Sequence, residues 1–141
     1  MRKITSLKMF MVVIFATIGA LSFAQTTDLL ISEYAEGSSG NSKYVEIYNG
    51  TGAEIDLANY RIWTIANGGS WPEGTLNLSG KIAHGATFVI ANNATDVPGA
   101  DLYNTNCNWN GDDAVGLAKN ISETWTLIDA VGTDGTDPGT G

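Results

Sequence analysis

The chain has 141 residues, the size of one domain on the usual range of roughly 100–200 residues per domain. Seven basic against fifteen acidic side chains give a formal net charge of -8. That charge excludes the basic surface that neutralises nucleic-acid phosphates and argues against attraction to anionic lipid. One cysteine excludes an intramolecular disulfide and a cysteine-rich zinc site, and one histidine, His84, excludes a His-Glu-x-x-His metal site.

The amino-terminal segment has the three parts of a secretory signal peptide. Basic residues cluster in positions 1–8, positions 9–23 are an almost unbroken apolar run, and Ser22-Phe23-Ala24 offers a small-residue cleavage site before Gln25. The alternative is a membrane anchor, which needs about 20 apolar residues, and this run is shorter and is followed at once by polar sequence. We therefore predict a signal peptide over residues 1–24 and a secreted, extracellular protein with no membrane span after cleavage.

Removal of this segment leaves 117 residues (141 − 24) with a formal charge of -11 (4 − 15). A secreted domain without disulfides depends on its apolar core. A chain of this size buries roughly 65% of the surface that it exposes when unfolded, which is sufficient for independent folding.

The remaining sequence alternates short strand patterns with turns. In residues 43–48, Val45 and Ile47 face one way while Tyr44, Glu46 and Tyr48 face the other, as in a half-buried antiparallel strand. Tight turns are predicted at Asn49-Gly50, 67–69, 98–99 and 110–111. The predicted strands, in chain order, are residues 28–34, 43–48, 55–57, 60–65, 75–78, 87–91, 114–118 and 125–131.

No stretch of ten or more residues after the leader shows a helical period. Seven or eight short strands at this spacing predict an all-β fold, an antiparallel β-sandwich with a small barrel as the alternative. We expect one domain over residues 25–132, followed by a Gly/Asp/Thr-rich loop or linker over residues 133–141.

Four segments in order resemble the lamin tail domain family. Residues 30–34 (Leu-Ile-Ser-Glu-Tyr), 43–49 and 54–62 resemble the opening of that domain, and residues 78–90 resemble its middle. Residues 110–117 (Asn-Gly-Asp-Asp-Ala-Val-Gly-Leu) and 127–132 resemble its late hairpin. The resemblance covers residues 28–132. It implies an immunoglobulin-like β-sandwich, found in secreted bacterial proteins beside nucleases, phosphatases or adhesion modules.

The sequence departs from that family at two places. Gly50 stands where many relatives have proline, and relatives continue into one more strand after the point where this chain ends at Gly141. We expect that the chain is a fragment. A missing final strand would leave an unpaired sheet edge, so we expect residues 25–141 to be marginally stable and to self-associate.

The two residues most suited to nucleophilic chemistry have structural interpretations. His84 lies between two predicted strands, and no Gly-x-Ser-x-Gly elbow accompanies it, so we interpret it as an exposed turn residue. Cys107 has no base near it in the sequence and is interpreted as a small buried apolar residue. An odd cysteine in a secreted protein also allows an intermolecular disulfide.

Asp112 and Asp113, with Asn110 and Gly111, offer the hard oxygen ligands that Ca²⁺ prefers. The spacing does not fit an EF-hand loop, and an Asp/Asn-rich turn explains the same residues without metal. Glu33 and Glu36 could join such a site only if the fold brings them close. We assign no metal site and no cofactor.

Four tryptophans raise the possibility of carbohydrate binding, because sugars stack on exposed aromatic faces. Trp63, Trp71 and Trp109 are the candidates, and Trp71 is the best of them because it lies in a glycine-rich loop. The alternative is that these residues pack in the core.

These patterns predict a secreted, non-catalytic module for adhesion, targeting or spacing within a larger extracellular protein. Its partner is unknown, with protein or polysaccharide as the options, and no direct binding of nucleic acid is expected. The alternatives are a carbohydrate-binding module and the amino-terminal accessory domain of a secreted nuclease or other hydrolase.

Overall fold

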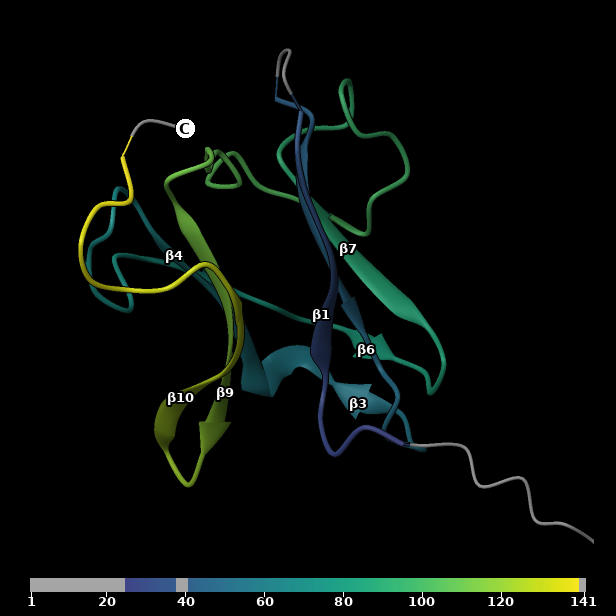
Figure 1. Cartoon of the computed structure of the whole chain (residues 1–141). Helices are drawn as coiled ribbons and strands as arrows, with labels where there is room; N and C mark the ends of the chain where they lie inside the picture. The colour runs from purple at the N-terminus through teal and green to yellow at the C-terminus, as the bar shows by residue number, and fades with distance from the viewer. Residues whose placement is uncertain (1–24, 38–40, 140–141) are drawn as a thin grey trace, which may run out of the picture.

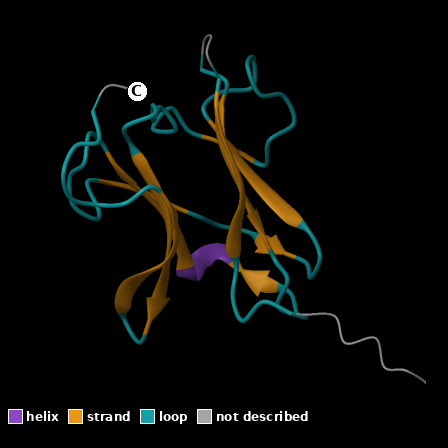
Figure 2. Cartoon of the chain, viewed as in Figure 1, coloured by secondary structure: helices purple, strands orange, loops and turns teal. Residues whose placement is uncertain are grey.

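Two four-stranded sheets pack face to face, and a small two-stranded sheet lies at one end (Figures 1 and 2). The computed structural model describes residues 25–37 and 41–139. The predicted signal peptide, residues 1–24, lies outside this range. Within the described residues, no helix has the length and apolar character needed to cross a membrane.

The first sheet has the strand order β1-β2-β7-β8. Its strands are β1 (Leu30–Glu36), β2 (Lys43–Tyr48), β7 (Thr87–Ala91) and β8 (Leu102–Tyr103). Neighbours are antiparallel except β7 and β8, which run parallel. The alternation predicted for residues 43–48 is confirmed, since Val45 and Ile47 are fully buried while Tyr44, Glu46 and Tyr48 stay partly exposed.

The second sheet has the order β10-β9-β4-β5, and all its neighbours are antiparallel. Its strands are β4 (Tyr60–Ile65), β5 (Gly74–Asn77), β9 (Ala114–Ile121) and β10 (Thr124–Val131). The small third sheet pairs β3 (Ile55–Asp56) with β6 (Lys81–Ile82), and a single 3-10 turn, η1 (Leu57–Asn59), leads from β3 into β4.

Apolar side chains from the facing sides of both sheets form the core. Cross-strand partners share a face, so Ile62 of β4 lies beside Leu117 of β9, and Val45 of β2 lies beside Ile90 of β7. The fully buried side chains of largest volume are Trp109, Ile47, Leu57, Ile62, Ile65, Ile82, Ile90 and Leu117. The predicted all-β sandwich is confirmed, and the barrel alternative is wrong.

Asn49 is a fully buried polar residue that organises one end of the sandwich. Its Nδ2 donates to the carbonyls of Ala53 and Ile82, at 2.7 and 2.8 Å, and its Oδ1 accepts the N–H of Thr51. These bonds hold residues 49–54 as an open loop that delivers the chain to the third sheet. The tight turn predicted at Asn49-Gly50 is therefore wrong, because β2 leads into this open loop and the next strand, β3, pairs with β6 and not with β2.

Strands β1 and β10 are edge strands of different sheets and meet along one side of the sandwich. Each strand has a register irregularity, at Ile31/Glu33 in β1 and at Leu127/Asp129 in β10. The Asp129 carboxylate accepts the N–H of Ile31 at 2.7 Å. Bulges and inward-turned charges of this kind make an edge a poor template for another strand. The self-association expected from the sequence stays a prediction.

The segment after β10 folds back over the second sheet. The N–H of Gly135 donates to the carbonyl of Gly69 at 3.1 Å, and a Cβ atom at Gly68 would overlap the backbone of Asp137. Figure 1 shows this segment in yellow beside the end of β4. The loop expected over residues 133–141 thus packs on the 67–69 turn as far as it is described.

Candidate functional site

His84 lies in an exposed turn between β6 and β7, as the sequence predicts. Its Nδ1 accepts the N–H of Gly52 at 3.0 Å, so the ring links two surface loops. A general base needs a nearby nucleophile within hydrogen-bond reach. The hydrogen bond of the imidazole joins it to a backbone N–H group, so the ring stabilises the arrangement of the two loops.

Cys107 is 1% exposed and belongs to the core, so the apolar interpretation is confirmed. Burial raises the pKa of its thiol to about 12. Because the thiolate is the reactive form, a thiol with so high a pKa is inert as a nucleophile near neutral pH. Its depth in the core also keeps it from pairing with a cysteine on another chain.

Asp112 and Asp113 form a hydrogen-bonded turn before β9. The two carboxylate oxygens of Asp113 accept the N–H groups of Asn67 and Asn110, at 3.0 and 2.9 Å, and Asp112 accepts the amide of Asn110. Asp113 therefore joins the β4–β5 loop to the start of β9, which is the plain-turn interpretation. The part of the chain that the structure describes contains no group of three or more His, Cys, Asp or Glu side chains placed to hold a metal ion.

The two glutamates weighed for a calcium site have other partners. Glu33 accepts the hydroxyl of Tyr44 at 2.7 Å on the outer face of the first sheet, and Glu36 accepts the hydroxyl of Tyr34 at 3.4 Å. Burial, followed by the nearby Glu36 carboxylate, raises the pKa of the Tyr34 hydroxyl well above its usual value. Glu33 is thus committed to a tyrosine contact on β2, and the structure does not bring it to Asp112 and Asp113.

A polar cluster closes the seam between residues 25–29 and the second sheet. Asp28 accepts the ammonium of Lys119 and the hydroxyl of Tyr60, both at 2.6 Å. Burial tends to raise the pKa of Asp28, but the hydrogen bonds from Lys119, Tyr60 and the Leu29 N–H outweigh it and lower the pKa overall. Mainly through its bond to Asp28, the pKa of Lys119 is raised. Both groups are held in their charged forms, so this cluster is an ion pair and not an acid–base device.

Two recesses of the surface contain carboxylates that already have hydrogen-bond partners. One of about 140 Å³ lies between the edge of β4 and the 106–109 segment, smaller than the roughly 300–1,000 Å³ of typical ligand pockets. Its two carboxylates, Glu73 and Asp113, already accept backbone N–H groups. A wider recess of about 530 Å³ runs between residues 25–30 and Ile128–Asp129. Its carboxylates, Asp28 and Asp129, are occupied by the contacts given above.

Two of the three tryptophans proposed from the sequence are buried. Trp109 is 2% exposed, stacks on Tyr34 with ring centroids 5.8 Å apart, and donates its indole N–H to the carbonyl of Ala35. Trp63 is 8% exposed. A platform built on Trp63 and Trp109 is therefore wrong, because the core takes Trp109 and neighbouring side chains cover Trp63.

Trp71 remains a candidate for sugar binding. A second tryptophan, Trp125, which the sequence did not single out, lies on the same outer face of the second sheet. Register places Trp125 of β10 beside Asn120 of β9 on the outer face of the second sheet, and the Cζ atom of Arg61 lies 3.6 Å from the centroid of a Trp125 ring. Trp71 and Trp125 are both partly exposed. The alternation of Trp125 with Leu127 was the available signal, but the outward direction of that pair depends on how β10 pairs with β9.

A sequence model of one known family, the lamin tail domain, matches residues 22–135. The chain belongs to the lamin tail domain family. The resemblance seen in the sequence is confirmed, and the two facing sheets agree with the immunoglobulin-like sandwich of lamin tail domains. No curated protein matches the sequence. Membership in this family is compatible with a non-catalytic module.

Proposed function

We propose that this lamin tail domain is a secreted, non-catalytic module that serves adhesion or targeting within an extracellular protein. One observation carries the proposal. In the described residues, the side chains best suited to catalysis hold the fold together: His84 and Asp113 accept backbone N–H groups, and Cys107 is buried with a raised pKa. Fold alone does not define function, so the support comes from these residues.

The composition supports an extracellular location. A basic-then-apolar leader of the signal-peptide type precedes the domain. Mass spectrometry of the protein recovered from the culture medium of a secreting host is expected to give an amino terminus at or within a few residues of Gln25. Recovery of the protein only from cells, with Met1 retained, would contradict export.

Hydrolysis assays test the proposal that the module is non-catalytic. The purified chain is expected to hydrolyse neither DNA, phosphoesters nor polysaccharides above the buffer rate. A His84→Ala variant is the control, since His84 is the residue most suited to acid–base chemistry. Turnover by the parent chain that disappears in this variant would overturn the proposal.

A further inference from the structure

The outer face of the second sheet is built from aromatic and very small residues. The outward positions of its strands, fixed by register, are Arg61, Trp63, Ile65, Thr75, Asn77, Ala114, Gly116, Ala118, Asn120, Trp125, Leu127 and Ala130. Central strand β9 contributes only alanine and glycine over most of its length. Its residues 114–118 are buried without interruption, although alternate side chains point away from the sandwich core.

Two tryptophans from different elements lie over this strip of small residues. At Gly116, an added Cβ atom would lie 3.1 Å from Cζ3 of Trp71 and would overlap a methyl group of Leu127, so the indole rests directly on the backbone of β9. Trp125 lies beside Asn120, four positions further along β9, which corresponds to roughly 13 Å at the usual strand rise. We call Arg61, Trp63, Trp71, Trp125 and Leu127 the aromatic face.

The charge of the aromatic face differs from that of the whole molecule. None of its outward strand positions is a carboxylate, in a chain of net charge -8, and its one ionised group is Arg61. Strand β9 lies between β4 and β10, so the Arg61 side chain reaches across it to stack on Trp125. The amides of Asn77 and Asn120 and the hydroxyl of Thr75 lie at the edges of the face, uncharged and able to donate and accept hydrogen bonds.

We infer that the aromatic face binds a neutral polysaccharide, with the sugar rings stacked against Trp71 and Trp125. Such a ligand presents apolar C–H faces to the indoles, while its hydroxyls exchange hydrogen bonds with amide side chains and with the guanidinium of Arg61. This step rests on the proposed binding function and names its ligand class.

Other partners fit the aromatic face less well. A phosphate-bearing or uronic-acid polymer would meet one arginine on a strongly acidic molecule. A stable protein partner needs about 800 Å² on each side, whereas the partly exposed large apolar side chains here are two tryptophans and Leu127. The absence of carboxylates from the outward strand positions and an aromatic rather than aliphatic surface together favour the sugar chain.

The test is affinity electrophoresis of the full chain, purified from the expressing host, through gels that contain soluble β-glucan, xylan or mannan. Pull-down on insoluble cellulose and chitin covers crystalline polymers. At least one neutral polymer is expected to retain the protein. Trp125→Ala and Trp71→Ala are each expected to weaken retention at least tenfold, Asn120→Ala to weaken it severalfold, and Trp125→Tyr to keep most of it.

Tyr48→Ala is the matched control, because Tyr48 is a partly exposed aromatic residue on the outer face of the other sheet, and it is expected to bind as the parent does. Circular dichroism and Tm identify variants that fail to fold, and the two conservative changes, Asn120→Ala and Trp125→Tyr, keep the test valid if a tryptophan deletion unfolds the chain. Absence of retention in every neutral polymer would overturn the inference. So would retention that survives in Trp71→Ala and Trp125→Ala, or an effect of these variants on self-association alone.

The two proposals fail differently. If the chain adheres to a protein surface through residues that the tryptophan variants leave intact, the adhesion function stands and the sugar site is wrong. If the chain cleaves a polymer that it retains, the non-catalytic function is wrong.

Discussion

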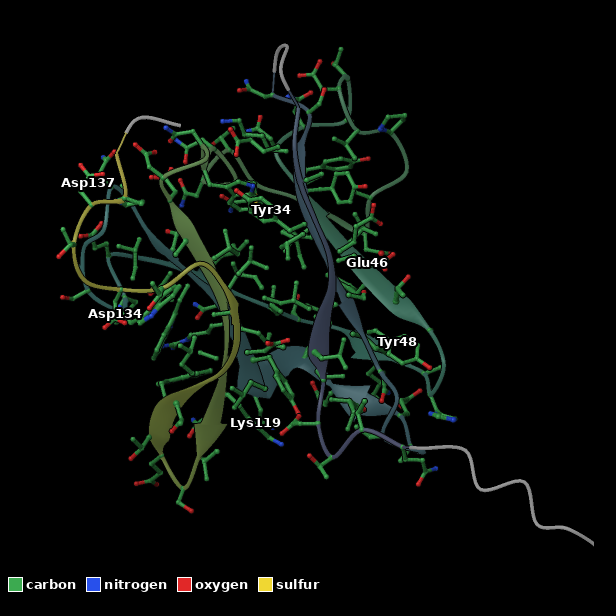
Figure 3. All side chains as sticks on the ribbon, viewed as in Figure 1. Tyr34, Glu46, Tyr48, Lys119, Asp134 and Asp137 are labelled. Atoms are coloured by element: carbon green, nitrogen blue, oxygen red, sulfur yellow. The ribbon has the colours of Figure 1, made fainter. Side chains whose placement is uncertain are left out.

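The two sheets of this sandwich have the same number of strands, but their outer faces differ in polarity and in exposure to solvent. On the first sheet, the outward residues of β1 and β2 include Glu33, Tyr44, Glu46 and Tyr48, and their polar atoms form bonds of 2.7 Å such as Ser32 Oγ to Glu46 and Tyr44 hydroxyl to Glu33. Figure 3 shows Glu46 and Tyr48 on the side away from the second sheet, and Tyr34 between the sheets. This face is solvated, as in most antiparallel sheets.

The second sheet uses its outer face as a further packing layer. Alanine and glycine along β9 let Trp71 and Leu127 lie close to the backbone, and Trp63 of β4 lies in register with Gly116, so that side chains on both faces of this strand are buried. The comparison shows that a strand of small residues converts a solvent face into a shallow second core. We therefore expect that the same kind of substitution will change the free energy of unfolding by different amounts on the two faces.

The largest difference is expected from aromatic truncation. Trp63→Ala is expected to lower the free energy of unfolding by about 3–5 kcal/mol, because the indole is 8% exposed and its removal leaves a cavity above β9. Tyr48→Ala, on the outer face of the first sheet, is expected to cost under about 1 kcal/mol, as at most surface positions. Chemical denaturation measures both losses, provided that the free energy of unfolding depends on denaturant concentration with the same slope in each variant. Equal losses for the two variants would show that the faces do not differ.

Added volume gives the next largest effect. Gly116→Val is expected to destabilise the fold by about 1–3 kcal/mol, since its side chain would overlap Leu127 and displace Trp71. Displacement of the Trp71 indole into water is also expected to shift tryptophan fluorescence to longer wavelength. Ala35→Val adds two methyl groups to the outer face of the first sheet, opposite Tyr44, and is expected to change stability by less than about 0.5 kcal/mol. A neutral Gly116→Val variant with unchanged emission would contradict the packing of Trp71 on β9.

Much of the fold could be predicted because strand alternation is a local signal. The eight predicted strands all occur, with ends that differ by a few residues: β5, predicted as 75–78, is Gly74–Asn77, and β9 runs on from residue 118 to Ile121. Strands β6 and β8 were missed because two residues are too few to show a period. The third sheet was missed with them, since it pairs residues 25 and 27 positions apart.

The candidate surface was less predictable, for a physical reason. Alternation tells which residues share a face but not which face another layer covers. The run from Ala114 to Ala118 is compatible with a solvated strand until Trp71 is placed over Gly116, and Trp71 comes from a loop 45 positions earlier. The buried Trp109 gave a misleading signal, because its neighbours in sequence are polar asparagines while its side chain packs on Tyr34.

Acid is expected to weaken the contacts between residues 25–29 and the second sheet, where Asp28 lies, more than it weakens either sheet face. The pKa of Asp28 is lowered in the folded chain, so its stabilising effect is present above its ordinary value of 3.8 and is lost as the pH falls through the lower folded value. We expect about 1 kcal/mol from this half-buried pair. Unfolding measured between pH 6 and pH 2 in Asp28→Asn should show a shallower decline than in the parent. A parallel decline in both proteins would place the acid-sensitive groups elsewhere.

The smallest effect concerns charge on the solvated face. Register sets Glu33 directly opposite Glu46, and like charges in that arrangement destabilise a sheet. Glu46→Lys would make an opposite pair and is expected to raise the free energy of unfolding by about 0.2–1 kcal/mol, reduced somewhat by loss of the exposed bond from Ser32. Glu46→Gln, which removes repulsion without adding attraction, should have a free energy of unfolding between those of the parent and Glu46→Lys.

The gain in the free energy of unfolding should shrink at about 1 M salt, where the screening length is about 3 Å. A gain unaffected by salt would show that it does not come from the charges, and a loss of stability in both variants would mean that the Ser32 bond outweighs repulsion between the two glutamates. The small size of the expected gain follows from the exposure of this face to solvent, which weakens each charge contact, whereas the Trp71 indole rests directly on the backbone of β9.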